Sequence, residues 1–242
     1  MKFILQKILN IFGYKVISLN NKIVKDFDQT IKKIFNKKKI KIIDIGANTG
    51  QTIDRFQRIF SNCEIYSVEP SFNAFSKLNR DYKEKKNISL FNFAIGDKKK
   101  NKIFYDYNDN VLSSFNKLNK KNSLNKIYKK NKVKVLSLDE FCKQYKISNI
   151  NILKIDTQGN EINVLRSGAK SLRSQIFDLI ELEIILGDYY NNFSNFFSLE
   201  GYLIKNNYRL LALDRRLNFF NDERMYCNAI YIKKNLYNKI KL

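Results

Sequence analysis

The sequence predicts an α/β domain with a doubly wound, mostly parallel sheet. Aliphatic and β-branched runs typical of buried strands alternate along the chain with segments that place apolar residues at helical spacing. Strands that alternate with helices form βαβ units, which make parallel sheets. The 242 residues, 44% of them hydrophobic, are sufficient for one such domain with its own core.

In the first half of the chain, three strands alternate with two helices. A β-branched run over 39–45 predicts a buried strand, and the apolar runs at 64–68 and 88–95 predict the next two. Apolar residues recur at helical spacing after each of the first two strands. The residues that mark these helices are Ile53, Phe56, Ile59 and Phe60, then Phe72, Phe75, Leu78 and Tyr82.

The second half repeats this alternation. Ser137 and Glu140 have the spacing of a capping box, which predicts a helix at 138–145. Further strands are expected at 150–155, 176–184, 208–213 and 229–232, with a helix through Ile162, Val164 and Leu165. We therefore expect a helical extension over 1–38 and a single domain over 39–242.

Two insertions interrupt the pattern and are expected to be loops. Residues 98–132 are rich in Lys and Asn with little periodicity, and residues 187–199 are aromatic and polar. Both follow expected strand ends, where open α/β sheets place their ligand crevice. Loops of this length in a compact domain commonly carry function.

The net charge of +22 has two explanations. It comes from 45 Lys and Arg against 23 Asp and Glu, and only nine of the cations are Arg. One explanation is a nucleic-acid or anionic-membrane surface. The other is genome composition, because Lys and Ile use A/T-rich codons while Arg, the residue favoured for phosphate recognition, is scarce.

Absent residue types narrow the chemistry. The chain has no His, which excludes Ser-His-Asp and Cys-His nucleophiles and His-ligated zinc. Its three cysteines form no C-x-x-C pair, so neither a zinc ribbon nor a disulfide scaffold is expected. A general base must therefore be Asp, Glu, Lys, Tyr or Cys.

The N-terminal segment 1–12 is apolar on one helical face and too short to span a bilayer. It lacks the uninterrupted apolar core and the small-residue cleavage site of a secretory signal. Such a segment packs on its own domain or lies in a membrane interface. We expect a cytoplasmic protein, with peripheral contact to the inner face of a membrane through 1–12 left open.

The segment from Ile42 to Gln51 combines a strand, a glycine turn and a helix start. A dinucleotide fingerprint would need glycine at positions 46, 48 and 51, and Asn48 and Gln51 do not meet that need. A P-loop is excluded because no Lys-Ser/Thr follows a longer glycine loop. Asp44 would repel a pyrophosphate but suits the ammonium and sulfonium of S-adenosylmethionine. Glu69 ends the second strand, where a carboxylate can accept from both ribose hydroxyls.

These motifs resemble the FkbM family of class I S-adenosylmethionine-dependent methyltransferases, over about 40–233. The first half carries Asp-Ile-Gly-Ala-Asn-Thr-Gly (44–50), Val-Glu-Pro (68–70) and Ala-Ile-Gly-Asp (94–97). The second half carries Leu-Lys-Ile-Asp-Thr-Gln-Gly-Asn-Glu (153–161), Val-Leu-Arg-Ser-Gly-Ala (164–169) and Ile-Glu-Leu-Glu (180–183). The resemblance implies a Rossmann-like methyltransferase fold: seven mostly parallel strands with an antiparallel last strand and helices on both faces. It also implies O-methylation of sugar or polyketide-type hydroxyls. Many members carry a hydrophobic residue and Glu where this chain has Thr157 and Gln158.

The cofactor contacts are expected at the first three strand ends. The glycine turn would approach the methionine end, with Asp44 holding the amino group directly or through water. Glu69 would bind the ribose and Pro70 would shape the turn beneath the adenine, whose edge would meet 92–94. The cofactor residues are therefore Asp44, Gly46, Ala47, Asn48, Gly50, Glu69, Pro70, Asn92 and Ala94.

The catalytic candidates follow the fourth and fifth strands. Asp156 is the first candidate for the base that takes the acceptor's proton. Lys154 could stabilise developing negative charge, or form a structural ion pair. Glu161 and Glu183 could orient the acceptor, and Glu161 has an equally good explanation as a first-turn helix carboxylate. These carboxylates could also bind Mg²⁺, but no metal site is predicted.

Two other function classes stay open. A nucleic-acid methyltransferase would suit the charge, but enzymes that act on a flipped base usually carry Asn/Asp-Pro-Pro-aromatic, and Pro70 is the only proline. A non-catalytic basic cofactor-binding protein is disfavoured by the intact Asp44, Glu69 and Asp156. The expected partner is a small-molecule or glycan acceptor rather than nucleic acid, and the oligomeric state stays undefined.

Overall fold

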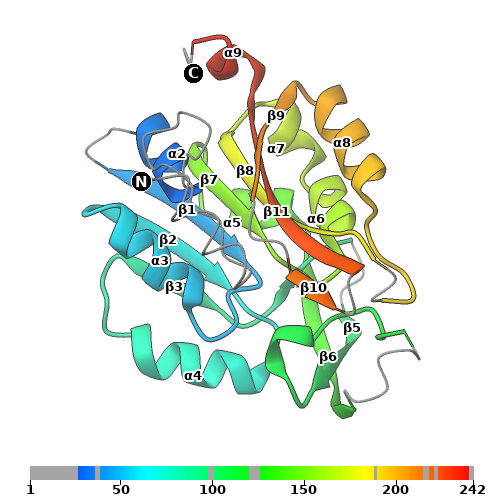
Figure 1. Cartoon of the computed structure of the whole chain (residues 1–242). Coiled ribbons are helices and arrows are strands. Elements are labelled where there is room, and N and C mark those ends of the chain that lie inside the picture. Colours follow the sequence, from blue (N-terminus) through cyan, green and yellow to red (C-terminus); the bar gives the residue numbers. More distant parts are fainter. Residues whose placement is uncertain are drawn as a thin grey trace, which may run out of the picture.

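An eight-stranded sheet forms the centre of the protein (Figure 1). The computed structural model describes residues 27–35, 39–97, 101–119, 126–187, 190–214, 218–220 and 223–239. Its strands run in the order β10-β11-β8-β7-β1-β2-β3, and β9 also pairs with β11. They are β1 (Ile40–Ile45), β2 (Cys63–Val68), β3 (Ile88–Phe91), β7 (Ile150–Ile155), β8 (Phe177–Ile185), β9 (Tyr208–Leu213), β10 (Asn218–Phe220) and β11 (Glu223–Lys233).

The strand directions confirm the predicted fold class. Strands β3, β2, β1, β7 and β8 are parallel to one another, and β11 runs antiparallel to both β8 and β9. Together with β9 they make the seven-stranded, mostly parallel sheet with an antiparallel last strand. The short β10 is an addition that pairs antiparallel with the start of β11.

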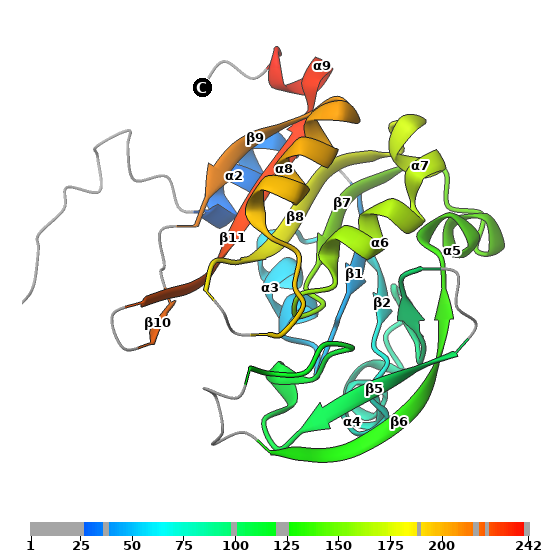
Figure 2. The same ribbon diagram turned by 90° about the vertical axis from the view of Figure 1, so that its right-hand side faces the viewer.

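Helices cover both faces of this sheet (Figure 2). Because strand side chains alternate, Ile40 and Ile42 face one core while Ile43 and Ile45 face the other. The first core is covered by α2 (Phe27–Ile34), α3 (Gln51–Ile59) and α4 (Phe72–Tyr82). The second is covered by α5 (Leu138–Gln144), α6 (Glu161–Ser167), α7 (Ala169–Arg173) and α8 (Phe196–Lys205). A short α9 (Lys234–Tyr237) follows the last strand. The capping box at Ser137 and Glu140 is present as predicted.

The region 98–132, expected to be a loop, instead contributes to a second sheet. Strands β5 (Asn101–Tyr107) and β6 (Ile127–Leu136) pair antiparallel, and a 3₁₀ turn, η1 (Asn110–Leu112), lies between them. The expected strand 88–95 is also interrupted, since its end is a separate strand, β4 (Ala94–Ile95), that pairs with β6. Lysine in this region hides the alternation, because Val133 and Val135 face inward and the residues between them face solvent.

The predicted N-terminal extension is described only in part. Its described helix, α2, packs on the first core through Phe27 and Ile31. The segment 1–12, for which membrane contact was left open, lies outside the described residues. Within the described part of the chain, no helix has the length and apolar character needed to cross a membrane.

Candidate functional site

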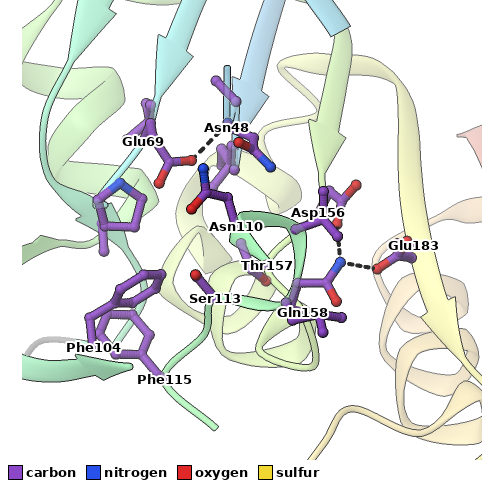
Figure 3. Close-up of a pocket in the computed structure, with 18 of the residues that line it drawn as sticks. Asn48, Glu69, Phe104, Asn110, Ser113, Phe115, Asp156, Thr157, Gln158 and Glu183 are labelled. Atoms are coloured by element: carbon purple, nitrogen blue, oxygen red, sulfur yellow. Dashed lines mark hydrogen bonds between the residues drawn. The ribbon is translucent and has the colours of Figure 1, made fainter. Parts of the chain in front are cut away.

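A cavity of about 620 Å³ lies at the carboxyl ends of β1, β2, β7 and β8. This is the crevice where open α/β sheets bind ligands, and its volume is typical of a small-molecule site. Glu69 and Asn48 lie on one side and Asp156, Gln158 and Glu183 on the other (Figure 3). Residues from β5 and the η1 region form the remaining wall, so the 98–132 insertion borders the crevice as expected.

The glycine turn after β1 forms the floor of the cavity. Gly46 has φ +87°, and a Cβ atom there would collide with the backbone carbonyl of Asp156. The absence of a side chain at Gly46 therefore lets the ends of β1 and β7 meet, while Ala47 and Asn48 line the cavity. Gly50 (φ +106°) does not line it; a Cβ atom there would strike the ring of Tyr82. Gly50 thus serves the packing of the turn against α4.

Glu69 is anchored at the end of β2 by two backbone amides. Its Oε2 accepts from the Asn48 amide at 2.8 Å and its Oε1 accepts from the Ser71 amide at 2.7 Å. Burial raises the pKa of Glu69 to about 7, although these hydrogen bonds oppose the shift. Because each carboxylate oxygen has a second lone pair, Glu69 can still accept from two ligand hydroxyls.

Of the other residues predicted to contact the cofactor, some line the cavity and one supports the turn that carries Glu69. Pro70 and Ala94 line the same cavity as Glu69. Asn92 does not line it: its Nδ2 donates to the carbonyl oxygens of Glu69 and Pro70 at 2.8 and 3.4 Å. Asn92 therefore fixes the turn that carries Glu69, at the point where β3 and β4 separate.

Asp44 and Lys154 are buried one layer beneath the cavity. In the parallel register, Lys154 lies between Asp44 on β1 and Glu181 on β8, all on the α3 face of the sheet. They do not reach the cavity because they lie deeper along their strands: on the same strand faces, the residues two positions after Lys154 and Glu181, which are Asp156 and Glu183, line it. Burial raises the pKa of Asp44 to about 7, opposed by the charge of Lys154. Burial alone would lower the pKa of Lys154, but the surrounding carboxylates raise it.

Asp156, Gln158 and Glu183 form one hydrogen-bonded cluster in the cavity wall (Figure 3). Gln158 Nε2 donates to Asp156 Oδ1 at 2.9 Å and to Glu183 Oε2 at 2.5 Å. Lys154 Nζ approaches Asp156 Oδ2 from beneath, at 3.4 Å. Burial and the neighbouring Asp156 raise the pKa of Glu183 well above its usual value. This shift favours the protonated form of Glu183, and the Asp156 side chain, 31% exposed, is the accessible carboxyl group of the cluster.

Glu161 is fully buried and holds the loop after β7. Its Oε1 accepts from the amides of Thr157 and Gly159 at 3.0 and 3.1 Å and from the Thr157 hydroxyl at 3.0 Å. It does not line the cavity. The structure thus favours the structural interpretation of Glu161 over an acceptor-orienting one.

The two insertions meet over this loop. Leu118 and Tyr190 form an isolated antiparallel bridge, and the Asn191 amide donates to the Lys117 carbonyl at 2.9 Å. Ser114 Oγ donates to the Gln158 carbonyl at 2.7 Å, and Tyr190 Oη lies 2.8 Å from Gln158 Oε1. Gln158, with φ +53°, is therefore held from both insertions.

Several lining residues are not among the predicted ones. Phe104 and Phe115 meet edge to face at 5.3 Å on the cavity wall (Figure 3). Gln158 hydrogen-bonds both Asp156 and Glu183. The only sequence signal that marked Gln158 was its departure from the family pattern. Additional lining residues are Thr52, Asn110, Ser113, Ile185, Tyr190 and Tyr226. Among the described residues, no group of three or more Cys, Asp or Glu side chains is arranged to hold a metal ion.

Three of the solved structures that are similar to this chain share little sequence identity with it. One is M. capricolum TrmK in complex with S-adenosyl-homocysteine: 11% identity, TM-score 0.49, covering 87% of this chain and 69% of that one. Another is an rRNA methylase from Streptococcus thermophilus: 9% identity, TM-score 0.48, covering 85% and 93%. A third is precorrin-6y C5,15-methyltransferase from Geobacter metallireducens: 9% identity, TM-score 0.47, covering 89% and 93%.

Sequence comparison identifies the family. No curated protein matches the chain. The model of the methyltransferase FkbM domain matches residues 44–210. This match spans more than half of the chain and includes the glycine turn, Glu69 and the Asp156–Glu183 cluster. The chain therefore belongs to the FkbM methyltransferase family.

Proposed function

We propose that this protein transfers a methyl group from S-adenosylmethionine to a hydroxyl of a sugar, a glycan or another small molecule. One observation carries the proposal: a single cavity has a carboxyl group held by two backbone amides, Glu69, at one side and an accessible carboxyl group, Asp156, at the other. The first can hold the cofactor, and the second can receive the acceptor's proton.

The residues on the cofactor side fit this cofactor. Glu69 can accept hydrogen bonds from the ribose hydroxyls. Asn48 Oδ1 is buried and has no hydrogen-bond partner among the described residues, so it is available to an ammonium group. The Phe104 and Phe115 rings on the cavity wall offer an apolar surface for adenine. Asp44, one layer deeper, contributes negative potential beneath the turn.

On the acceptor side, the protein has to align a hydroxyl and accept its proton. When bound, the cofactor supplies an electrophilic methyl group for in-line displacement. Asp156 takes the hydroxyl proton as its oxygen becomes the nucleophile. Gln158 and Lys154 fix the two oxygens of Asp156, which sets the direction of the free lone pairs. The raised pKa of Glu183 disfavours a second negative charge beside the base.

The charge of the cavity wall supports a neutral acceptor group. Asp109 and Asp156 line it, and among its described lining residues there is no Lys or Arg. An anionic group entering the cavity would be repelled by this wall, whereas a polyhydroxyl unit could donate to it. A neutral sugar hydroxyl is therefore the acceptor that the wall favours.

Transfer of labelled methyl groups tests the proposal. The full-length protein should move label from methyl-labelled S-adenosylmethionine to neutral glycans, and an ether product should keep that label in mild alkali. Equal amounts of RNA and of a carrier protein serve as competing acceptors. Label found only in RNA or in the carrier protein would contradict the proposed acceptor class.

Cofactor affinity is expected to increase between pH 6 and pH 8. Ribose hydroxyls donate to the ionised form of Glu69, and burial raises the pKa of this carboxyl to about 7. Affinity for S-adenosylhomocysteine should therefore improve about tenfold over this range, with release of a proton on binding near pH 7. Calorimetry in buffers of different ionisation enthalpy measures both quantities, and Glu69→Gln should flatten the profile.

The stability of the cofactor-free protein should respond in the opposite direction. The folded-state pKa values of Asp44 and Glu69 lie above the unfolded values, near 3.8 and 4.5. Their stabilising contribution is therefore fully present below the unfolded pKa values and is lost as pH rises through about 7.

For the affinity prediction, cofactor affinity that falls from pH 6 to pH 8 in the wild type would contradict the assignment of Glu69.

A further inference from the structure

The outward face of the β5–β6 pair carries a row of lysines. Along β6, Val133 and Val135 are buried against the inner side, while Lys130, Lys132 and Lys134 are exposed on the other. Alternate residues of a strand are about 6.6 Å apart, so the three ammonium groups repeat along one line. The pair lies along the lower margin of the molecule, outside the main sheet (Figure 2).

Strand β5 adds an apolar residue to this lysine row. Ile103 is directly opposite Lys132, so this pair shares the outward face, whereas Tyr105, opposite Lys130, is half-buried and packs against the apolar cluster around Tyr107 and Tyr190. Ile103 is 52% exposed. At the end of the row lies Tyr128, 66% exposed at a register shift of β6. The face is therefore both basic and partly apolar.

The charge of this face is not neutralised within the described part of the chain. None of the three lysines in the row forms an ion pair there. Asp106, the acidic residue of β5, is buried and accepts from Asn131 Nδ2. The face thus presents uncompensated positive charge around an exposed aliphatic side chain.

We propose that the outward face of β5–β6 docks on the surface of an anionic lipid bilayer. Lysines attract anionic headgroups without needing a fixed geometry, and Ile103 and Tyr128 can enter the boundary between headgroups and acyl chains. A single-stranded nucleic acid would use the lysines and Tyr128 but not the exposed isoleucine. It would also favour Arg, which is absent from this face.

Docking would bring the cavity close to acceptors carried by a membrane. The inward side of the same strand pair supplies Phe104 to the cavity wall, and Phe115 follows in the connection to β6. The inference that a membrane-linked hydroxyl compound is the acceptor rests on the proposed function. The docking itself does not, because it can be measured without cofactor.

Vesicle binding by the full-length protein tests docking. Wild type should co-sediment with phosphatidylcholine–phosphatidylserine vesicles and not with phosphatidylcholine alone. Changing Lys130, Lys132 and Lys134 together to Gln should weaken this binding about 100-fold. Ile103→Ser should weaken it about tenfold, and this loss should persist when salt is raised.

A matched triple variant distinguishes vesicle binding through the β5–β6 face from binding that depends on net charge alone. Lys77→Gln, Lys143→Gln and Lys205→Gln together remove the same charge from exposed positions on α4, α5 and α8. This variant should bind vesicles nearly as well as wild type. Equal losses in both triple variants, or no loss in the β6 triple, would overturn the proposal.

A single-stranded oligouridylate is the competing probe. Binding to it that depends on the three β6 lysines, without binding to anionic vesicles, would overturn the membrane proposal and assign the face to RNA. Binding of S-adenosylhomocysteine by each variant reports on the cofactor site and on folding. Loss of vesicle binding with intact cofactor binding is therefore distinct from failure of the proposed function.

Discussion

Replacing Asp156 by Asn is expected to slow methyl transfer by roughly 10²- to 10⁴-fold, the usual contribution of a general base. The change keeps the shape of the side chain and its contact with Gln158 but removes the group that takes the acceptor proton. Because Asp156 is only one of many residues around the cavity, affinity for S-adenosylhomocysteine should change little. Single-turnover rates with labelled cofactor and saturating acceptor measure the effect.

Glu183→Gln is the informative comparison for this variant. Burial and the neighbouring Asp156 raise the pKa of Glu183 and favour its protonated form, so a neutral amide of similar shape should lower the rate far less than Asp156→Asn does. Asp97→Asn, at an exposed turn outside the cavity, controls for loss of an acidic group. If Glu183→Gln abolished transfer and Asp156→Asn did not, the roles assigned to the two carboxyls would be exchanged.

Arg55→Ala is expected to lower the free energy of unfolding by about 3–5 kcal/mol. Arg55 on α3 binds Glu181 Oε1 at 2.6 Å and Asp28 on α2 at 2.7 Å. Glu181 is 1% exposed, and its other oxygen already has no hydrogen-bond partner among the described residues. Removing the guanidinium leaves this carboxylate buried beside Lys154, whose Nζ is 4.0 Å away. Urea denaturation followed by circular dichroism measures the loss.

A double variant shows whether the cost comes from an unpaired buried charge. Arg55→Met with Glu181→Met replaces the pair by apolar side chains, and should recover much of the stability lost in Arg55→Ala. Arg80→Ala removes an exposed pair with Asp81 and should change stability by less than about 1 kcal/mol. The single variants Arg55→Met and Glu181→Met provide the comparison. A double variant whose loss of stability equals the sum of the losses in these two single variants would contradict this explanation.

Much of the main sheet and one side of the site could be predicted from local patterns. A β-branched run followed by a glycine turn predicts β1 and the floor of the cavity, because Gly46 has a backbone geometry that the pattern itself requires. Glu69 could be placed because it ends the neighbouring strand. In both cases the information lies within a few residues of the chain.

Other features depend on contacts between distant segments. The β5–β6 pair was expected to be a loop, because lysine at outward positions obscures its alternation. Asp44 and Lys154 were expected at the ligand, but they pair within their strands, two residues below Gly46 and Asp156, which line the cavity. Gln158 gains its place from Ser114 and Tyr190, which are 44 and 32 residues away. No short motif encodes these approaches.

Asn92 and Glu161 illustrate a second limit. Both are polar residues at strand or helix ends near the cavity, where sequence alone equally permits a ligand contact and a hydrogen bond to a nearby loop. The structure shows that both bind backbone groups: Asn92 at the turn after β2 and Glu161 at the loop after β7. Their side chains therefore stabilise the loops that carry the cavity-lining residues.

Calorimetric titration with S-adenosylhomocysteine and S-adenosylmethionine tests the central claim most directly. We predict saturable binding to the wild type, weakened about 100-fold in Glu69→Ala because charge-assisted hydrogen bonds to two hydroxyls are lost. Glu69→Gln retains one acceptor oxygen and should lose less, and the exposed Glu84→Ala should bind like the wild type. Absence of binding to the folded wild type, or unchanged affinity in Glu69→Ala, would contradict the account.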